Sequence, residues 1–180
     1  GLAHYVWRDF RGKWGSRVVL DREAVTLDLP AGRSLIHRVP AQRLTIPYAD
    51  IASVETRLEA YRSFGMANMQ RAYALRRKSG QWIFLFEDRA LATQYETSFF
   101  ADIAGRLAAR AGVAMCDLGM VEGRGGFLAV WGTHAQDCSA PSLPADRQAR
   151  LWRRVIFTGQ LAGLSAAIVF LLWVLQTIFR

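Results

Sequence analysis

Side chains that could carry out chemistry are few and scattered in this sequence. Cys116, His134 and Cys138 supply three potential metal ligands, but none of them forms the Cys-x-x-Cys pair typical of structural zinc sites. The glycine-rich run from Glu122 to Gly126 offers a backbone nest for phosphate, and an ordinary turn explains the same composition. No nucleophile elbow, Walker loop or His-Glu-x-x-His motif is present. The sequence therefore predicts a protein that is not an enzyme and holds no metal or cofactor.

Basic residues gather with tryptophan in two groups, one near each end of the chain. The excess of Lys and Arg over Asp and Glu is 23 − 15 = +8, a charge that attracts anionic partners. We predict that the two groups contact lipid headgroups at the membrane interface: Trp7, Arg8, Arg11, Lys13, Trp14, Arg147, Arg150, Trp152, Arg153 and Arg154. The alternative is a topology signal without a specific ligand. Nucleic acid is not an expected partner, because no nucleic-acid-binding motif is present.

The segment from Val155 to Phe179 predicts a single transmembrane helix. No charged residue occurs from Val155 to Leu175, a stretch of about 31 Å at ~1.5 Å per residue, close to the hydrocarbon thickness of a bilayer. The alternative, a buried helix of a soluble protein, normally keeps a polar stripe. Because arginines crowd the amino-terminal side, we expect that side to face the cytosol. Small residues predict a face for packing against another membrane helix: Gly159, Ala162, Gly163, Ala166 and Ala167.

Residues 16–112 show the pattern of strands followed by one helix. Apolar and β-branched runs predict strands in antiparallel meander order: 17–20, 24–29, 35–39, 43–46, 52–60, 71–78 and 81–87. In the fifth of these, apolar and polar residues alternate, which is the period of a half-buried strand. Apolar residues then recur every four positions from Leu91 through Phe99 to Leu107. They predict an amphipathic helix, with Asp88 as its amino-terminal cap and Gly112 at its end.

The run Leu-Thr-Ile-Pro-Tyr-Ala-Asp-Ile-Ala-Ser-Val-Glu at 44–55 resembles the entry into a long strand of bacterial pleckstrin-homology-like (PH-like) domains that are attached to membrane helices. The hairpin at 71–87 and the helix after it complete a resemblance that covers residues 17–112. It implies an α+β fold, a partly open antiparallel barrel capped by one helix and used for binding or assembly. Some relatives are assembly factors of bacterial membrane complexes. Another small barrel or sandwich with an added helix is the alternative.

These patterns divide the chain into four parts. Residues 1–15 form a juxtamembrane segment, which we interpret as the end of an upstream membrane span, and residues 16–112 form the PH-like domain. Residues 113–146 form an irregular extension with a candidate strand at 127–131. Residues 147–180 form the basic segment and the transmembrane helix. We expect a non-enzymatic accessory subunit or assembly factor of a bacterial inner-membrane complex, its PH-like domain on the cytoplasmic side. Its expected partners are membrane lipids and other integral membrane subunits. A membrane-surface sensor of anionic lipid headgroups is the alternative.

Overall fold

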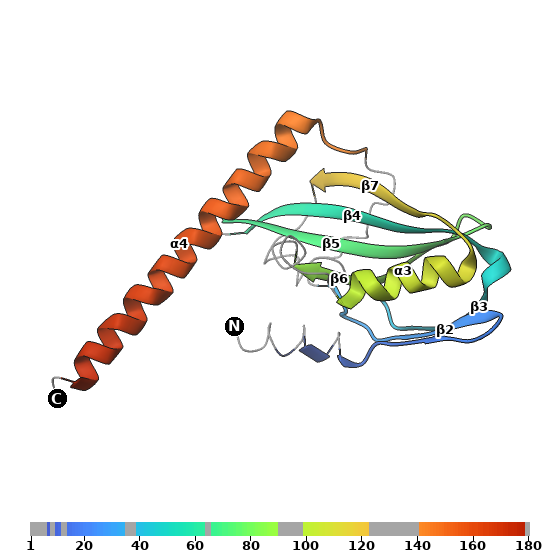
Figure 1. Cartoon of the computed structure of the whole chain (residues 1–180), viewed down its shortest axis with the longest axis horizontal. Helices are drawn as coiled ribbons and strands as arrows, with labels where there is room; N and C mark the ends of the chain where they lie inside the picture. Colours follow the sequence, from blue (N-terminus) through green and yellow to red (C-terminus); the bar gives the residue numbers. More distant parts are fainter. Residues whose placement is uncertain are drawn as a thin grey trace.

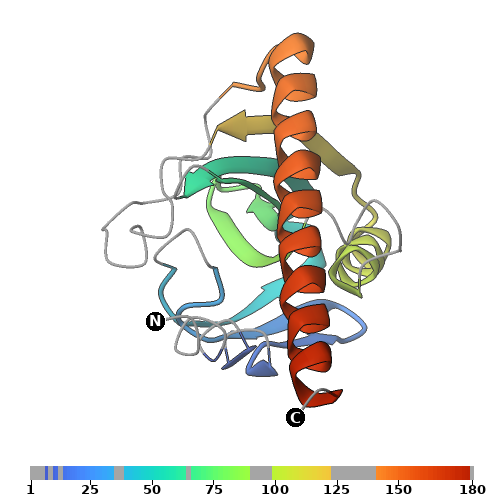
Figure 2. The ribbon, with the colours of Figure 1, turned by 90° about the vertical axis from the view of Figure 1, so that its left-hand side faces the viewer.

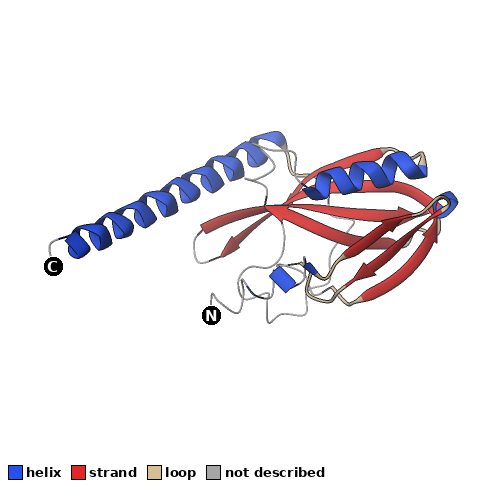
Figure 3. Ribbon diagram, turned by 60° about the horizontal axis from the view of Figure 1, so that its bottom comes forward, coloured by secondary structure: helices blue, strands red, loops and turns tan. Residues whose placement is uncertain are grey.

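The computed structural model describes residues 7, 10–11, 14–34, 39–63, 66–89, 99–122 and 141–178 of the chain. These residues contain two β-sheets, a helix packed against them and a long helix that runs away from them (Figure 1). The strands gather at one end of the molecule and the long helix extends from it (Figure 3). The α+β class expected from the sequence is therefore confirmed.

The first sheet is antiparallel and has the order β1-β2-β3, formed by Arg17–Leu20, Ala24–Leu29 and Gln42–Pro47. Alternate residues of β2 face the core, since Val25, Leu27 and Leu29 are at most 1% exposed. Thr26 and Asp28 lie between them on the opposite face of the strand. The hairpin predicted for this part of the chain is confirmed.

The second sheet has the order β6-β5-β4-β7, formed by Trp82–Arg89, Met66–Arg77, Ile51–Ser63 and Met115–Glu122. A short 3-10 turn, η1 (Tyr48–Asp50), leads from β3 into β4. Strands β4, β5 and β6 are antiparallel neighbours and follow each other along the chain, as predicted. The turn between β5 and β6 favours glycine because Gly80 has a φ of 85°.

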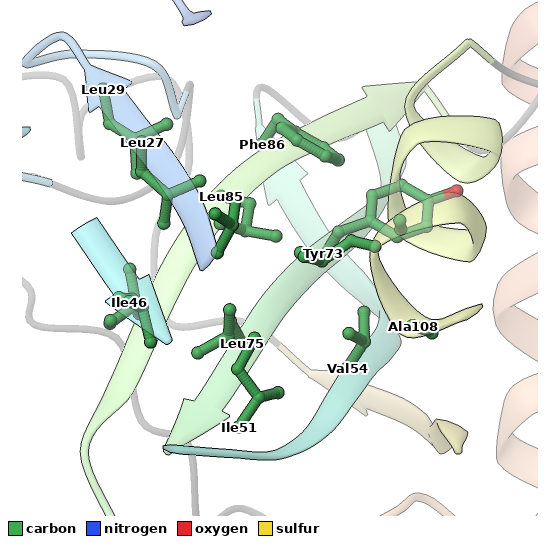
Figure 4. Close-up of a cluster of buried hydrophobic side chains, with 14 of the residues drawn as sticks. Leu27, Leu29, Ile46, Ile51, Val54, Tyr73, Leu75, Leu85, Phe86 and Ala108 are labelled. Carbon is green, nitrogen blue, oxygen red and sulfur yellow. The ribbon is translucent and has the colours of Figure 1, made fainter. Parts of the chain in front are cut away.

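Helix α3 (Phe99–Ala111) packs on β4, β5 and β6 and closes a core shared with the first sheet. Its Phe100 ring stacks on that of Phe86 with 4.5 Å between centroids. Buried side chains from both sheets and α3 make up this core (Figure 4): Val25, Leu27, Leu29, Ile46, Tyr48, Ile51, Val54, Tyr73, Leu75, Ile83, Leu85, Phe86, Ala104, Leu107 and Ala108. Burial of this apolar surface is the main driving force for the fold.

Two details of the predicted helix are wrong. Phe99 is 72% exposed rather than buried, and Phe100 takes the core position in its place. Asp88 lies inside β6 and is followed by another strand residue, so it does not cap a helix. The predicted end is confirmed, because Gly112 has a φ of 65° directly after α3. Leu91 and Tyr95 lie outside the described residues.

The irregular extension predicted for 113–146 is wrong in its first part, which forms β7. This strand pairs with β4 in parallel, with Glu55 opposite Cys116 and Glu59 opposite Val121. A parallel neighbour needs a long crossover, and α3 lies in the connection that supplies it. The sequence gives little sign of β7, because apolar and polar residues alternate over only a few positions and Gly119 interrupts the pattern. The strand order is therefore not a pure antiparallel meander.

The described residues form two separate sheets and show no closed barrel. The PH-like barrel consequently stays a prediction. Of the other predicted strands, 127–131 lies outside the described residues, and so does 35–39 apart from Val39, which is not in a strand.

Helix α4 (Ala145–Ile178) continues without interruption from the basic segment through the apolar segment. It is long and apolar enough to cross a membrane, and the described part of the chain contains one such helix. Its carboxy-terminal part extends away from both sheets (Figures 1 and 3), and in Figure 2, seen from the side to which it projects, α4 crosses in front of the strands. Phe179, the predicted last residue of the span, lies outside the described residues.

Candidate functional site

The amino-terminal third of α4 docks on one end of the second sheet, where it contacts residues of β4, β5 and β7. Leu151 and Val155 are 5% and 3% exposed, and they lie four residues apart on one side of the helix. They form a second apolar cluster with three residues of the sheet and three partly buried neighbours: Ala60, Met69, Met120, Leu58, Leu143 and Trp152. We call this cluster the junction. It attaches the long helix to the domain through apolar packing.

Polar contacts hold the chain just before α4 against the end of β7. The Leu143 N–H donates to the Met120 carbonyl at 2.7 Å, and the Met120 N–H donates to Ser142 Oγ at 3.3 Å. Gln148 Nε2 donates to the Leu143 carbonyl at 2.7 Å, and Arg147 forms an ion pair with Glu122. Because these bonds join the sheet to the first turn of α4, they fix the direction in which the helix leaves the domain.

Gly119 makes this close approach possible. Its φ is 75°, a conformation that side chains rarely adopt, and a Cβ placed there would lie 3.0 Å from Ser142 Cβ and closer still to its Oγ. The Gly119 N–H donates to Asp117 Oδ1 at 2.8 Å, which closes the local turn. The sequence reasoning did not single out Gly119 or Ser142, because neither contact is visible without the pairing of β7.

Beyond the junction, the described apolar side chains of α4 are exposed, apart from Val174, which is partly buried. No residue in its most apolar stretch is buried within the molecule. The exposed apolar residues run through six turns: Ile156, Phe157, Leu161, Leu164, Ile168, Val169, Phe170, Leu171, Leu172, Trp173, Leu175 and Ile178. A water-soluble protein would bury such a surface, so this geometry suits a lipid environment.

Hydroxyl groups within this apolar stretch are satisfied by the helix itself. Thr158, Ser165 and Thr177 each donate to a backbone carbonyl four residues earlier, at 2.9, 2.9 and 2.8 Å respectively. Such bonds remove a polar group that would otherwise be costly in hydrocarbon.

The small residues predicted for helix packing lie on α4. Gly159, Gly163, Ala166 and Ala167 are exposed, and a Cβ built at Gly163 meets no atom within 4 Å. The side chain of Ala162 lies outside the described residues. Within the part of the chain that the structure describes, nothing covers this face.

The second basic group lies on the first three turns of α4. Arg147, Arg150, Arg153 and Arg154 are all exposed, and Arg150 pairs with Asp146 at 2.8 Å. Trp152 packs on the junction instead of standing free at the interface. The four arginines lie on one side of the helix just before the apolar segment, and we call this basic patch the collar.

Of the first group, Trp7, Arg11 and Trp14 are described and all three are exposed, whereas Arg8 and Lys13 lie outside the described residues. Phe10 belongs with them, because its ring lies 6.1 Å from that of Trp7 and 5.3 Å from that of Trp14. The sequence reasoning missed Phe10, although the spacing of positions 7, 10 and 14 is that of one helical face.

The polar side of β4 is buried, although its alternation predicted an exposed face. Glu55, Arg57 and Glu59 are at most 5% exposed. Arg57 pairs with Glu59 at 2.7 Å, and Glu55 accepts from Arg76 at 2.5 Å. Removing a charge from water is costly unless an opposite charge lies beside it. These ion pairs therefore allow this face of β4 to be buried. Residue types alone give no signal of it.

Arg33 joins the two sheets from a position that is 2% exposed. It donates to the carbonyl oxygens of Pro30 at 2.9 Å, Pro40 at 2.7 Å and Phe84 at 2.9 Å. Its burial lowers the pKa of the guanidinium to about 10. It also donates to Gln42 Oε1 at 3.2 Å, so its hydrogen bonds connect the segment between β2 and β3 to β6 of the second sheet.

The other basic and metal-ligating groups considered in the sequence lie only partly within the described residues. The hairpin arginines Arg71, Arg76 and Arg77 pair with Asp117, Glu55 and Asp50, which leaves this basic group largely neutralised. Among the described residues no three His, Cys, Asp or Glu side chains are placed to hold a metal ion. Cys116 is a free thiol in β7, while His134 and Cys138 lie outside the described residues.

Comparison of the chain with protein-family models, with curated proteins and with solved structures finds no match.

Proposed function

We propose that this chain is a non-enzymatic accessory subunit or assembly factor of a bacterial inner-membrane complex. Its PH-like domain lies on the cytoplasmic side and contacts partners there, while α4 packs among the membrane helices of other subunits. One observation carries the proposal: the amino-terminal part of α4 is packed against the domain, whereas the apolar remainder of the same helix is exposed.

The attachment of α4 to the domain links the packing of the helix in the membrane to the orientation of the domain outside it. When a helix is attached through a flexible linker, its packing in the membrane leaves the soluble domain free to turn. Here Ser142 and Leu143, just before α4, are hydrogen-bonded to Met120 of β7, and Gln148 of α4 donates to the Leu143 carbonyl. Arg147 of α4 pairs with Glu122 of β7, so no flexible linker separates the helix from the sheet. A partner that binds the helix therefore also sets the orientation of the domain at the membrane surface.

The charge distribution supports the cytoplasmic side. The collar of Arg147, Arg150, Arg153 and Arg154 precedes the apolar segment, and arginine near a membrane helix favours the cytoplasmic face. The domain precedes the collar and lies on the same side of the bilayer.

Mild detergent extraction of the full chain, followed by size-exclusion chromatography and mass spectrometry, tests the proposal. We expect defined membrane proteins to co-elute with the wild type. The double variant Gly159→Leu/Gly163→Leu fills the small-residue face and should lose them. A matched control, Leu161→Phe/Ile168→Phe, adds bulk on the opposite side of the helix and should keep them. A monomer without partners under all mild conditions contradicts the proposal.

A second candidate function is a sensor of anionic lipid, which the exposed arginine collar favours. Purification of the full chain from mixtures of phosphatidylglycerol and phosphatidylcholine discriminates the two, with retained lipid quantified by mass spectrometry. A sensor retains phosphatidylglycerol selectively and loses it in Arg153→Gln/Arg154→Gln. Equal retention of both lipids removes this candidate.

A further inference from the structure

Three aromatic rings form an exposed stripe before the first strand. Trp7, Phe10 and Trp14 are 58%, 49% and 80% exposed, and their rings stack in sequence along one side of the helical turns. We call these three residues the aromatic stripe. Three large aromatic side chains that are exposed and adjacent form an apolar surface, and such a surface is typical of a binding site for an apolar partner or a membrane.

The stripe is attached to the domain near the end of the first sheet. The Gly15 N–H donates to the Arg11 carbonyl at 3.0 Å, so the last turn leads directly toward β1. A Cβ at Gly15 would lie 3.4 Å from Pro30 Cγ, which places this turn against the end of β2. In Figures 1 and 3 this end of the sheet is the one nearer to the projecting part of α4, and the β1–β2 turn lies at the far end.

We propose that the aromatic stripe is a second membrane contact, which lies in the plane of the interface of the leaflet that α4 enters. This inference rests on the proposed membrane location of α4. Its ligand is the bilayer interface itself, where the rings occupy the boundary between headgroups and acyl chains.

The residue types favour lipid over a protein partner. Tryptophan combines a large apolar ring with an N–H donor and is enriched at membrane interfaces. Arg11 is exposed beside the stripe, and the sequence adds Arg8 and Lys13. Tryptophan, phenylalanine and arginine are enriched at protein interfaces as well, but lysine is depleted there, and cations interleaved with apolar rings suit anionic headgroups above an acyl layer.

The contact has a mechanical consequence for the domain. With α4 alone, the tilt of the domain relative to the bilayer surface is set by a single attachment. A second contact at the first sheet restricts that tilt and holds one defined face of the domain toward the cytosol. The stripe also differs from the end of an upstream span, since in a plane of contact all three rings lie at the same shallow depth.

Depth-dependent quenching of a fluorophore on the full chain tests the inference. The probe is nitrobenzoxadiazole on Phe10→Cys in a Cys116→Ser/Cys138→Ser background, reconstituted in vesicles of phosphatidylcholine and phosphatidylglycerol. The lipids carry a spin label near the headgroup or near the chain end. Arg22→Cys, in the exposed β1–β2 turn at the far end of the sheet, is the matched control. Ile168→Cys reports on α4.

We expect strong loss of emission from Phe10→Cys with the shallow quencher, weaker loss with the deep quencher and none from Arg22→Cys. Absence of quenching at Phe10→Cys, while Ile168→Cys is quenched by the deep label, overturns the inference and leaves the proposed function standing. Stronger quenching of Phe10→Cys by the deep label also overturns it, because the segment then spans the bilayer. Absence of quenching at both Phe10→Cys and Ile168→Cys refutes the inference and the membrane location together.

Discussion

Replacement of Gly119 by alanine tests how tightly the domain holds α4. Alanine at a φ of 75° costs about 1 kcal/mol, because Cβ approaches the carbonyl oxygen in the left-handed conformation. The new Cβ also collides with Ser142, which must move and give up its hydrogen bond from the Met120 N–H. Overpacking and the lost bond together add about 2 kcal/mol. We therefore expect Gly119→Ala to destabilise the domain by about 3 kcal/mol.

The chain offers a matched control at Gly80. Its φ of 85° is similar, but a Cβ there meets nothing within 4 Å. Gly80→Ala should therefore show the conformational cost alone, about 1 kcal/mol. In a Ser142→Gly background the collision disappears, so the cost of Gly119→Ala should fall to the level of Gly80→Ala.

Urea unfolding of the full chain in mild detergent, followed by circular dichroism of the strands, measures all four variants. Equal costs for Gly119→Ala and Gly80→Ala, unchanged by Ser142→Gly, would refute the reasoning. That result would mean that residues 141–144 do not pack against β7. Limited proteolysis of this segment provides an independent reading, since a loosened junction exposes it to cleavage.

Three further sets of substitutions test other parts of the structure. Leu151→Ala should destabilise the junction by about 3 kcal/mol, measured by hydrogen exchange in the first turns of α4, whereas Leu164→Ala, at an exposed position, should not. Arg57→Met or Glu59→Met alone should cost about 3 kcal/mol in urea unfolding, and the double variant clearly less than the sum, because the single change strands a buried charge. If the cost of the double variant equals the sum of the two single costs, Arg57 and Glu59 do not interact as the structure shows. Arg33→Met should cost about 3 kcal/mol, since it leaves buried carbonyl oxygens without donors; an unchanged urea midpoint contradicts this.

The sequence predicts the elements whose periodicity is local. The strands at 24–29 and in the β4 region, the turn at Gly80 and the glycine after α3 are all visible in residue order, and the structure confirms these elements, although not the exposed face expected for β4. The apolar length of α4 is equally plain, because a helix that meets lipid on every side needs no pattern beyond hydrophobicity.

What the sequence hides depends on distant contacts. The parallel pairing of β7 with β4 needs a crossover that brings residues about sixty positions apart together, and its eight residues alternate weakly. Glu55, Arg57 and Glu59 have the composition of a solvated face, yet ion pairs allow their burial. The membrane-interface residues were predicted from charge and tryptophan content. The roles of Phe10 and Gly119 are visible only in their contacts with Trp14 and Ser142.

The central claim is that α4 crosses the bilayer with the domain on the cytoplasmic side. Labelling with a membrane-impermeant maleimide tests it directly, using Ala145→Cys and Arg180→Cys, one at a time, in a Cys116→Ser/Cys138→Ser background. The proposed orientation predicts that Ala145→Cys reacts in inverted vesicles of the inner membrane and that Arg180→Cys reacts in right-side-out vesicles. Reaction of both cysteines from the same side would contradict the claim.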